Sequence, residues 1–588
     1  MGVGLLSAGI GSVPQAQTLI DIGQGTRISQ SLYDESLPRL RVHPGAGGAL
    51  SRVPPAVWKR VRDRAGAAPA DLVPGLLGTT LARGGIRGRA DPRAGEAAAI
   101  LADGRGAILA GRGCRQRACP RVAVMAANLD RLRVLARRLR GRDLLIAMER
   151  PPPDRGRELT IGIAGAGFDG TLTSDSTRMR GYVLSTDIAP TILERLGLPV
   201  PDEMDGEPMD AEGGVDPAFV ERLADRLAVI GPRRGPVIGI NLLIWIGLAA
   251  LAGLAFGRRG LRTALPLLAV TVAYLPAVLL LTAGLGPSEL AERLVAGIGS
   301  PALALLTLRL VSVYGALAIA AVVSVLAYAI DVIAGAGLTE LSLMGPNPAG
   351  GLRFFGIGNE LEATVSALLP IGTGAALVAW APRISPRRAA LTFALTGLLA
   401  VAAFAPGQFG ADVGAAIGIP IGVGVAAALC LGGPSRRLWL LIAAPMVALA
   451  ALAASDLLLG GNAHLSRSVL HAGGFNQLAD VAERRLRLSA ANFSRYARTP
   501  MLWIAVLAVV AGISQRRQIE AWFTDRRAAW AGFVGAAAAT VAGTLANDSG
   551  ALLLMIGTVL CALSVGLAWA TQRERASTGL PDTHERVR

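Results

Sequence analysis

The chain has 588 residues, of which 52% are hydrophobic and only 17% are charged. This composition is typical of a multi-pass membrane protein and excludes a large soluble enzyme. The net charge of +16 comes largely from arginines in short clusters between apolar runs, as the positive-inside bias produces. Aromatic residues are not interleaved with these arginines as in single-strand binders, so we predict no nucleic-acid partner.

The apolar runs are confined to the later part of the chain. Residues 1–230 are rich in Arg, Asp and Pro and contain no run long enough to span a bilayer, whereas residues 237–571 hold nearly all the long apolar runs. We predict a soluble domain over 1–230, a membrane domain over 231–571 and a tail over 572–588. The first residues lack the basic start and the cleavage site of a signal peptide, so we expect the soluble domain to be truncated at its N-terminus.

Short apolar runs alternate with helical patterns in the soluble part. Arg121–Ala127 reads as a strand and is followed by LDRLRVLARRLRG, whose Leu and Val recur at helical spacing. Asp143–Glu149 and Glu158–Gly167 read as two further strands, and a helix starts at Asp187 and ends at Gly197. The alternation predicts an α/β domain with a mostly parallel sheet.

Two cysteines, Cys114 and Cys119, flank the sequence RQRA in this part. They would form a disulfide bond in an oxidising compartment and remain free thiols otherwise. Their spacing does not match a zinc ribbon, so we predict no metal there.

The run YVLSTDIAPTILERLGLPVPDEMDGEPM, Tyr182–Met209, resembles the C-terminal end of the alkaline phosphatase superfamily, which includes sulfatases and cofactor-independent phosphoglycerate mutases. In those proteins a strand leads to a D-I-A-P-T-(I/L)-L helix, a Leu-Gly-(Ile/Leu)-Pro turn and an M-D-G segment. The specific match covers residues 159–209, and the preceding strands and helices are compatible with the fold. The resemblance implies an incomplete alkaline-phosphatase-like domain over residues 1–230.

The catalytic residues of that superfamily are missing from this sequence. Its hydrolytic members use Asp and His ligands for paired divalent metals and a Ser, Thr or modified Cys nucleophile. The place where a ligand pair is expected reads Arg150-Pro-Pro-Pro-Asp154, and His43 is the only histidine in the first 460 residues. We therefore predict a degenerate, non-hydrolytic domain with no metal and no cofactor, unless an upstream segment restores a nucleophile.

Eleven apolar runs approach or reach the roughly 20 residues that a membrane-spanning helix needs. They are residues 237–256, 264–285, 294–307, 315–334, 361–381, 389–405, 413–431, 438–459, 501–513, 528–545 and 551–570. These runs predict a polytopic, all-α transmembrane bundle of about eleven helices, of which the short third and ninth are the least secure.

Arginine clusters predict the orientation of the bundle in the plasma membrane. They follow the first, fifth, seventh, ninth and last runs, so these connections and the C-terminus are expected in the cytoplasm and the soluble domain outside. The stretch Asn462–Thr499 is arginine-rich although the same scheme places it outside. Its pattern fits a helix in the headgroup layer or a solvated amphipathic connector.

The candidate ligand-binding residues lie in connections on the predicted outer side. Ionisable groups next to apolar runs are costly to insert, which indicates a functional site, although loops are also polar in general. The candidates are Asn347, Arg353, Asn359, Glu360, Glu362, Asp412, His464, Asn547 and Asp548.

Three functions are compatible with this pattern. The first is an envelope protein that binds or processes a lipid-linked or amphiphilic substrate at the outer face, with membrane lipids and such a precursor as its expected partners. The second is a transporter or flippase, favoured by Gly- and Pro-interrupted runs such as AIGIPIGVG, Ala416–Gly424. The third is a scaffold without a ligand. Product formation would identify the first and reconstituted flux the second.

Overall fold

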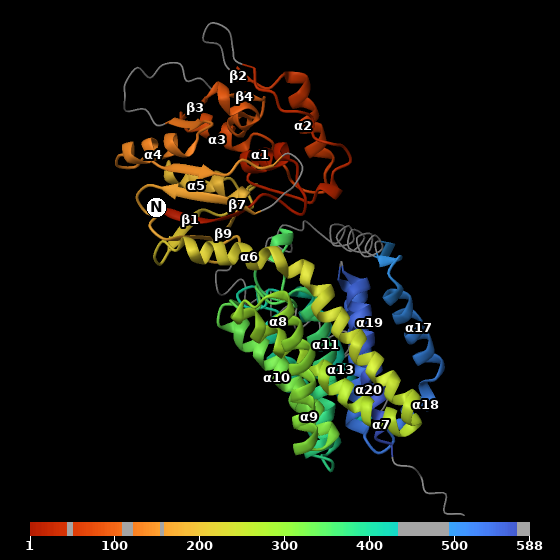
Figure 1. Cartoon of the computed structure of the whole chain (residues 1–588). Coiled ribbons are helices and arrows are strands. Elements are labelled where there is room, and N and C mark those ends of the chain that lie inside the picture. The colour runs from red at the N-terminus through yellow and green to blue at the C-terminus, as the bar shows by residue number, and fades with distance from the viewer. Residues whose placement is uncertain are drawn as a thin grey trace, which may run out of the picture. The chain divides into compact units, whose positions relative to one another are not determined.

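The computed structural model describes residues 1–43, 51–108, 121–152, 158–432, 493–494, 496–547 and 549–572. The chain forms two compact units. The first consists of Met1–Pro232 together with Pro346–Phe355, and the second of Arg233–Gly345 and Gly356–Arg588. Strands are confined to the first unit and the long apolar helices to the second (Figure 1). The expected succession of a sheet-containing part and a helical part is therefore confirmed.

The first unit is built around one central strand, β1. The principal sheet has the order β10-β8-β1-β7-β6, and β9 also pairs with β1. Its strands are β1 (Gly2–Ser7), β6 (Leu145–Met148), β7 (Glu158–Ala164), β8 (Thr171–Ser174), β9 (Tyr182–Leu184) and β10 (Met209–Glu212). Two small sheets pair β2 (Ser51–Arg52) with β4 (Ala107–Ile108) and β3 (Arg87–Ala90) with β5 (Arg121–Val124).

The prediction of a mostly parallel sheet is corrected by the observed pairing. Strand β1 runs parallel to β8 and β9, but β1–β7, β6–β7 and β8–β10 are antiparallel. The chain between β6 and β7 covers only residues 149–157. A parallel connection needs a crossover of about a dozen residues or more, so these neighbouring strands pair as a hairpin instead.

The helices of the first unit cover the sheet and close its core. They are α1 (Gln15–Gln24), α2 (Pro55–Ala67), α3 (Leu76–Arg83), α4 (Leu129–Arg138), α5 (Ile188–Arg195) and α6 (Pro217–Arg234). The predicted order β5–α4–β6–β7 and the helix after Asp187 are confirmed. Cys114 and Cys119 lie outside the described residues.

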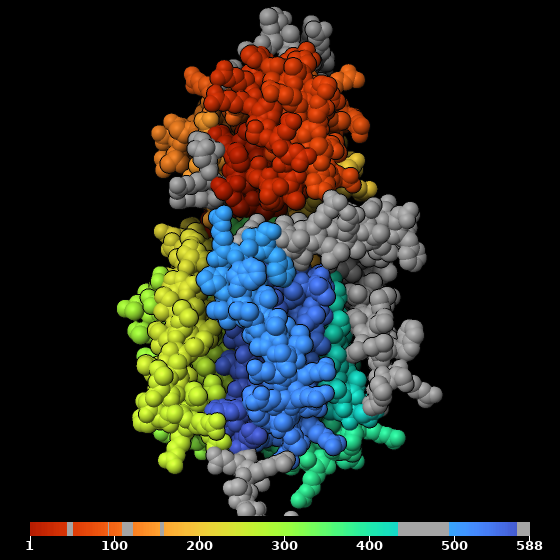
Figure 2. Space-filling view, turned by 90° about the vertical axis from the view of Figure 1, so that its right-hand side faces the viewer, coloured from red at the N-terminus to blue at the C-terminus, as the bar shows by residue number. Residues whose placement is uncertain are grey.

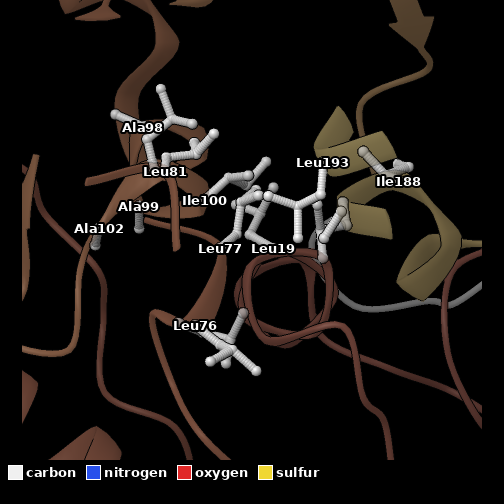
Figure 3. Packing of buried hydrophobic residues seen from close by; sticks show 14 of the residues in the cluster. Leu19, Leu76, Leu77, Leu81, Ala98, Ala99, Ile100, Ala102, Ile188 and Leu193 are labelled. Atoms are coloured by element: carbon white, nitrogen blue, oxygen red, sulfur yellow. The ribbon is translucent and has the colours of Figure 1, made fainter. Parts of the chain in front are cut away.

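The core of the first unit lies around α1. Leu19 of α1 packs with Leu77 and Leu81 of α3 and with Leu193 of α5 (Figure 3). The helix ends at Gly25, whose φ of 70° is the left-handed conformation that favours glycine. Burial of these aliphatic side chains fixes α1 against α3 and α5, which positions the polar residues described below.

The second unit is a bundle of apolar helices. Its helices are α7 (Ile240–Leu285), α8 (Glu289–Leu294), α9 (Ser300–Leu310), α10 (Val313–Ile333), α11 (Asn359–Trp380), α12 (Pro386–Phe404), α13 (Val413–Leu431), α17 (Pro500–Ser514), α18 (Arg516–Trp522), α19 (Arg527–Ala546) and α20 (Gly550–Ala570). Leu502 and Ala505 of α17 pack on Ala551 and Met555 of α20, and Figure 2 shows α17 on the surface of this unit.

Helix α7 is too long for one crossing and is interrupted. It has 46 residues, about twice what a bilayer requires. At Gly257 the backbone has φ 57° and ψ −139°, a conformation essentially restricted to glycine. Gly260 then lies against the carbonyl of Ala252, so the second half of α7 folds back on the first. The first two predicted runs occupy these two halves.

Within the described residues, eight helices are long and apolar enough to cross a membrane. One is the 69-residue stretch Pro217–Leu285, which includes both halves of α7. The ninth predicted run forms the shorter helix α17. The eighth run, 438–459, lies outside the described residues, as does most of Asn462–Thr499. A multi-pass protein is therefore confirmed, and the total of eleven helices stays a prediction.

Glycines bring three helices of the bundle into close contact. Gly374 of α11 lies against the carbonyl of Ala528, Gly532 of α19 against the carbonyl of Pro370, and Gly422 of α13 against that of Gly535. Small residues allow helix backbones to approach in this way in membranes. The close approach fixes the relative positions of the ends of α11, α13 and α19.

Candidate functional site

Four helix ends meet around Glu362 in the helical unit. Helices α11, α13 and α20 begin there and α19 ends there; we call this the polar end. Glu362 lies in the first turn of α11 and is 1% exposed. Its carboxylate occupies the space beside Gly414 of α13, where no side chain would fit. Glycine at this position therefore allows a carboxylate to be buried between α11 and α13.

Amide side chains complete a hydrogen-bonded network around Glu362. The Nδ2 atom of Asn547 donates to Glu362 Oε2 at 2.6 Å and to Asn359 Oδ1 at 3.3 Å. Asn359 Nδ2 donates to Ser549 Oγ at 2.7 Å, and the Ser549 amide donates back to Asn547 Oδ1 at 2.8 Å. A carboxylate is favoured at the N-terminus of α11, and these donors offset part of the cost of burying it.

A second charged pair lies at the same end. Arg234 donates through Nη1 to Glu360 Oε1 and through Nη2 to the carbonyl of Gly345 at 2.5 Å. The side chains of Arg234 and Glu360 remain 22% and 21% exposed. Because the pair is partly hydrated, it can exchange partners at lower cost than a fully buried one.

A third acidic residue holds the start of α8. Glu292 is fully buried and accepts from Arg233 Nη1 at 3.0 Å and from Thr282 Oγ1 at 3.3 Å. Arg233 also donates to the carbonyl of Pro287 at 2.8 Å. Through these bonds Glu292 joins α8 to the end of α6 and to α7, so it is best explained as structural.

The polar end includes several of the predicted site residues. Asn359, Glu362 and Asn547 form one network, and Glu360 pairs with Arg234. Asp412 is fully buried and caps α13 by accepting from the Ala415 amide at 2.8 Å. His464 and Asp548 lie outside the described residues. Sequence reasoning did not identify Arg234, Ser549 or Glu292, because each is paired with a residue far away in the chain.

Asn347 and Arg353 do not belong to the helical unit. They lie in residues 346–355, which pack in the first unit and which we call the strap. The strap carbonyls of Gly350 and Gly351 accept from the Gly11 amide at 3.1 Å and from Arg27 Nη2 at 2.9 Å. Two strap carbonyls are therefore bonded to Gly11 and Arg27, whereas the buried Asn347 Oδ1 has no hydrogen-bond partner among the described residues.

Aromatic contacts also hold the strap. The ring of Phe354 lies 5.7 Å from that of Tyr182 and 5.2 Å from the Arg27 guanidinium. The Tyr182 hydroxyl donates to the carbonyl of Pro348 at 3.4 Å. Strands β1 and β9 are parallel, and the strap lies next to the segment after β1 and to Tyr182 of β9. Ligands of open α/β sheets bind at the carboxyl ends of such strands.

The buried carboxylate of Asp187 is satisfied by hydrogen bonds from the chain itself. Asp187 is buried, which raises its pKa, while Ser176, Leu184, Ser174 and Glu207 donate hydrogen bonds to it. It accepts from Ser174 Oγ and Ser176 Oγ at 2.7 Å each. Asp187 thus ties the start of α5 to the turn after β8, and its side chain makes no capping hydrogen bond to α5.

Another buried carboxyl lies within α1. Burial raises the pKa of Asp21 to about 7, although Gln17, the charges of Arg27 and Arg64, and Gln24 all act to lower it. Gln17 and Gln24 donate to its Oδ1 at 2.7 and 3.0 Å. Arg27 is itself buried, which lowers the pKa of its guanidinium, and it donates to Ser7 Oγ at 3.0 Å.

This edge does not fit a pair of divalent metals. Arg27 places a positive charge there, and the strap fills the neighbouring positions with its backbone. No group of three or more His, Cys, Asp or Glu side chains suited to a metal occurs among the described residues. Divalent ions need several anionic or neutral oxygen and nitrogen ligands, so we derive no metal-dependent step here.

No protein-family model, curated protein or solved structure matches this chain.

Proposed function

We propose that the chain is a polytopic plasma-membrane protein whose helical unit binds an amphiphilic substrate of the envelope, such as a lipid-linked precursor, at the polar end. The observation that carries this proposal is the network of Glu362, Asn359 and Asn547 at the meeting point of four helix ends. Ionisable groups at such positions in membrane helices are costly and are retained mainly for function.

The chemistry of the polar end fits a head group attached to an apolar tail. Its amides and carboxylates can exchange hydrogen bonds with hydroxyl or amide groups, and a guanidinium binds phosphate in a bidentate manner. Arg234 and Glu360 are the accessible members of this end. We propose that an anionic head group replaces Glu360 as the partner of Arg234.

The helix connections support the proposed orientation. The connections α10–α11, α12–α13 and α19–α20 all lie at the polar end. This is expected because successive membrane-spanning helices run in opposite directions. At the other end of α20, Arg526 donates to Thr571 Oγ1 at 2.9 Å. We propose that the arginine-rich end faces the cytoplasm and the polar end the outer side, with about eleven helices in all.

The first unit is proposed to be a non-hydrolytic alkaline-phosphatase-like domain outside the cytoplasm. Its residues 182–209 carry the resemblance, and the strap and Arg27 occupy the edge of β1 and β9. The observed mixed sheet supports the domain only as an α/β layer. Metal-dependent turnover of phosphomonoesters or phosphodiesters by the full-length protein would contradict the non-hydrolytic assignment.

The binding proposal is tested by complementation of a deletion strain followed by lipidomics. Variants Glu362→Ala and Asn547→Ala should accumulate the same amphiphile as the deletion strain. Ser324→Ala is the matched control, because Ser324 is also buried in the bundle but donates to Ala273 O, away from the network. Full complementation by both site variants at normal protein levels would refute the proposal.

A transporter is the second candidate. Helices α11 and α13 contain the internal prolines Pro370 and Pro420, and Gly- or Pro-containing membrane segments are typical of the discontinuous helices of transporters. Substrate flux in proteoliposomes, abolished by Glu362→Ala, would favour transport over binding alone.

A further inference from the structure

A buried carboxyl without a partner lies in the connection after α10. Glu340 belongs to residues 334–345 of the helical unit and is 6% exposed. Its Oε1 atom is inaccessible to water and has no hydrogen-bond partner among the described residues. The neighbouring Thr339, Ser342 and Leu343 are fully buried. A carboxylate in such surroundings is very costly unless a proton or another cation neutralises it.

The connection is held in a fixed conformation by α10. Asp331 accepts from the amides of Leu338 and Thr339 at 3.2 and 2.7 Å and from Thr339 Oγ1 at 2.6 Å. The Glu340 amide donates to the carbonyl of Ala336 at 3.0 Å. The adjacent residue Thr339 is thus tied to Asp331, which places Glu340 next to a second carboxylate.

The charges around Glu340 favour its neutral form. Burial, and then the negative charge of Asp331, raise the pKa of Glu340 to about 9. The other titratable or charged groups that contact this connection are Tyr328, whose hydroxyl is 2.7 Å from Ser342 Oγ, and Arg234. Arg234 is bound by Glu360 and by the carbonyl of Gly345.

We propose that Glu340 is a proton-binding site of the helical unit, a role that goes beyond the proposed substrate binding. Its carboxylate takes a proton from water to form the neutral acid, and the acid returns the proton to water when residues 334–345 become hydrated. Uptake and release of the proton are therefore coupled to the conformation of this connection.

The geometry favours a proton over a metal ion. Asp331 already accepts one hydrogen bond at Oδ1 and two at Oδ2, so it has little capacity left for coordination. Hard cations require about six oxygen ligands, and two carboxyl groups do not supply them. A single proton neutralises the buried carboxyl group without further ligands.

The test is infrared spectroscopy of the full-length protein in lipid, titrated with acid and base in H₂O and D₂O. We expect a carboxylic-acid carbonyl band at neutral pH that disappears as the pH rises through about 9. Glu340→Gln should remove this band. Glu289→Gln, which changes an exposed glutamate, should keep it. Asp331→Asn should move its disappearance to lower pH, since the neighbouring negative charge is lost.

Thermal stability provides a second readout. A raised pKa means that the stabilising contribution of the acid is present at low pH and is lost as the pH rises through the folded pKa. Glu340→Gln should therefore match the wild type near pH 4, and its melting temperature should exceed that of the wild type by a margin that grows as the pH rises from about 4.5 to about 9. Identical spectra of wild type and Glu340→Gln at every pH would overturn the proposal. So would loss of the wild-type band on addition of Na⁺ at constant pH.

Discussion

Two places in this chain have the position of a ligand site: the carboxyl edge of β1 and β9 in the first unit, and the polar end of the helical unit. They differ in whether their polar groups are already bonded to other parts of the chain. At the sheet edge, Gly11, Arg27 and Tyr182 donate to carbonyls of the strap. At the polar end, the Arg234–Glu360 pair stays partly exposed, and Glu340 in the connection after α10 keeps a carboxyl oxygen without a partner.

The comparison shows that a sheet edge is not a ligand-binding site merely because α/β sheets often bind ligands at that position. The α/β layer provides the edge, but a segment of the same chain fills it, and the Arg27 guanidinium is bonded to that segment. Function has to be argued from the side chains present. By that criterion, we place the proposed binding site in the helical unit, whereas the strap occupies the sheet edge of the first unit.

The largest expected effect is the pH dependence of the stability of the first unit, which depends on the buried carboxyl of Asp21. Asp21 has a raised pKa of about 7, so its neutral form stabilises the first unit at low pH, and this contribution is lost between about pH 4 and pH 7. The shift corresponds to at most about 4 kcal/mol. Asp21→Asn should remove this pH dependence. The readout is the temperature at which the first unit of the full-length protein becomes sensitive to protease; an unchanged pH profile would contradict the prediction.

Removal of the Arg27 side chain should release the strap. Arg27→Ala deletes hydrogen bonds to Ser7 and Gly351 and the contact with the Phe354 ring. Hydrogen bonds of charged groups contribute roughly 1.5–3 kcal/mol each, so we expect a loss of about 3 kcal/mol. Hydrogen exchange of residues 346–355 should increase strongly. In Arg60→Ala, which changes an exposed arginine of α2, exchange should stay at the wild-type level.

A smaller change at Gly351 tests the same contact without altering charge. Gly351 has φ 74° and lies against the carbonyl of Gly9, so even an alanine there is strained and displaces the strap. The expected cost is about 1–3 kcal/mol. Gly350→Ala is the matched control, because only the Asn347 amide lies within ordinary contact distance of its added methyl group. Equal protease sensitivity of the two variants would show that the strap is not held at Gly351.

The smallest effect on stability is expected at the polar end. Glu360→Gln weakens a partly exposed ion pair, which should cost less than about 1 kcal/mol. The same change frees Arg234, so binding of an anionic, phosphate-bearing amphiphile should become tighter. Binding to full-length protein by microscale thermophoresis measures this, and weaker binding would contradict the proposed exchange of partners.

Local patterns allowed much of the fold to be predicted. Apolar runs located the membrane helices that the structure describes, and the DIAPTIL segment located α5. Alternation of the runs also placed Asn359, Glu362 and Asn547 at one end, where the structure joins them. These features depend on residues that are close in sequence, or on counting how often the chain crosses the membrane.

The features that escaped prediction depend on long-range pairing. Nothing local indicates that Arg234 meets Glu360, or that Gly350 in the strap meets Gly11. The direction of β7 was missed because alternation of strands and helices does not specify which neighbours pair. Asn347 and Arg353 were grouped with the membrane residues by sequence position, although their segment packs in the first unit.

The central claim is that the Glu362 network binds an amphiphile. Native mass spectrometry of the full-length protein released from its own membranes tests it most directly. The wild type and Ser324→Ala should retain the same lipid-linked species, and the double variant Glu362→Ala/Asn547→Ala should have lost it. The same bound lipids on all three proteins, or none on the wild type, would contradict the claim.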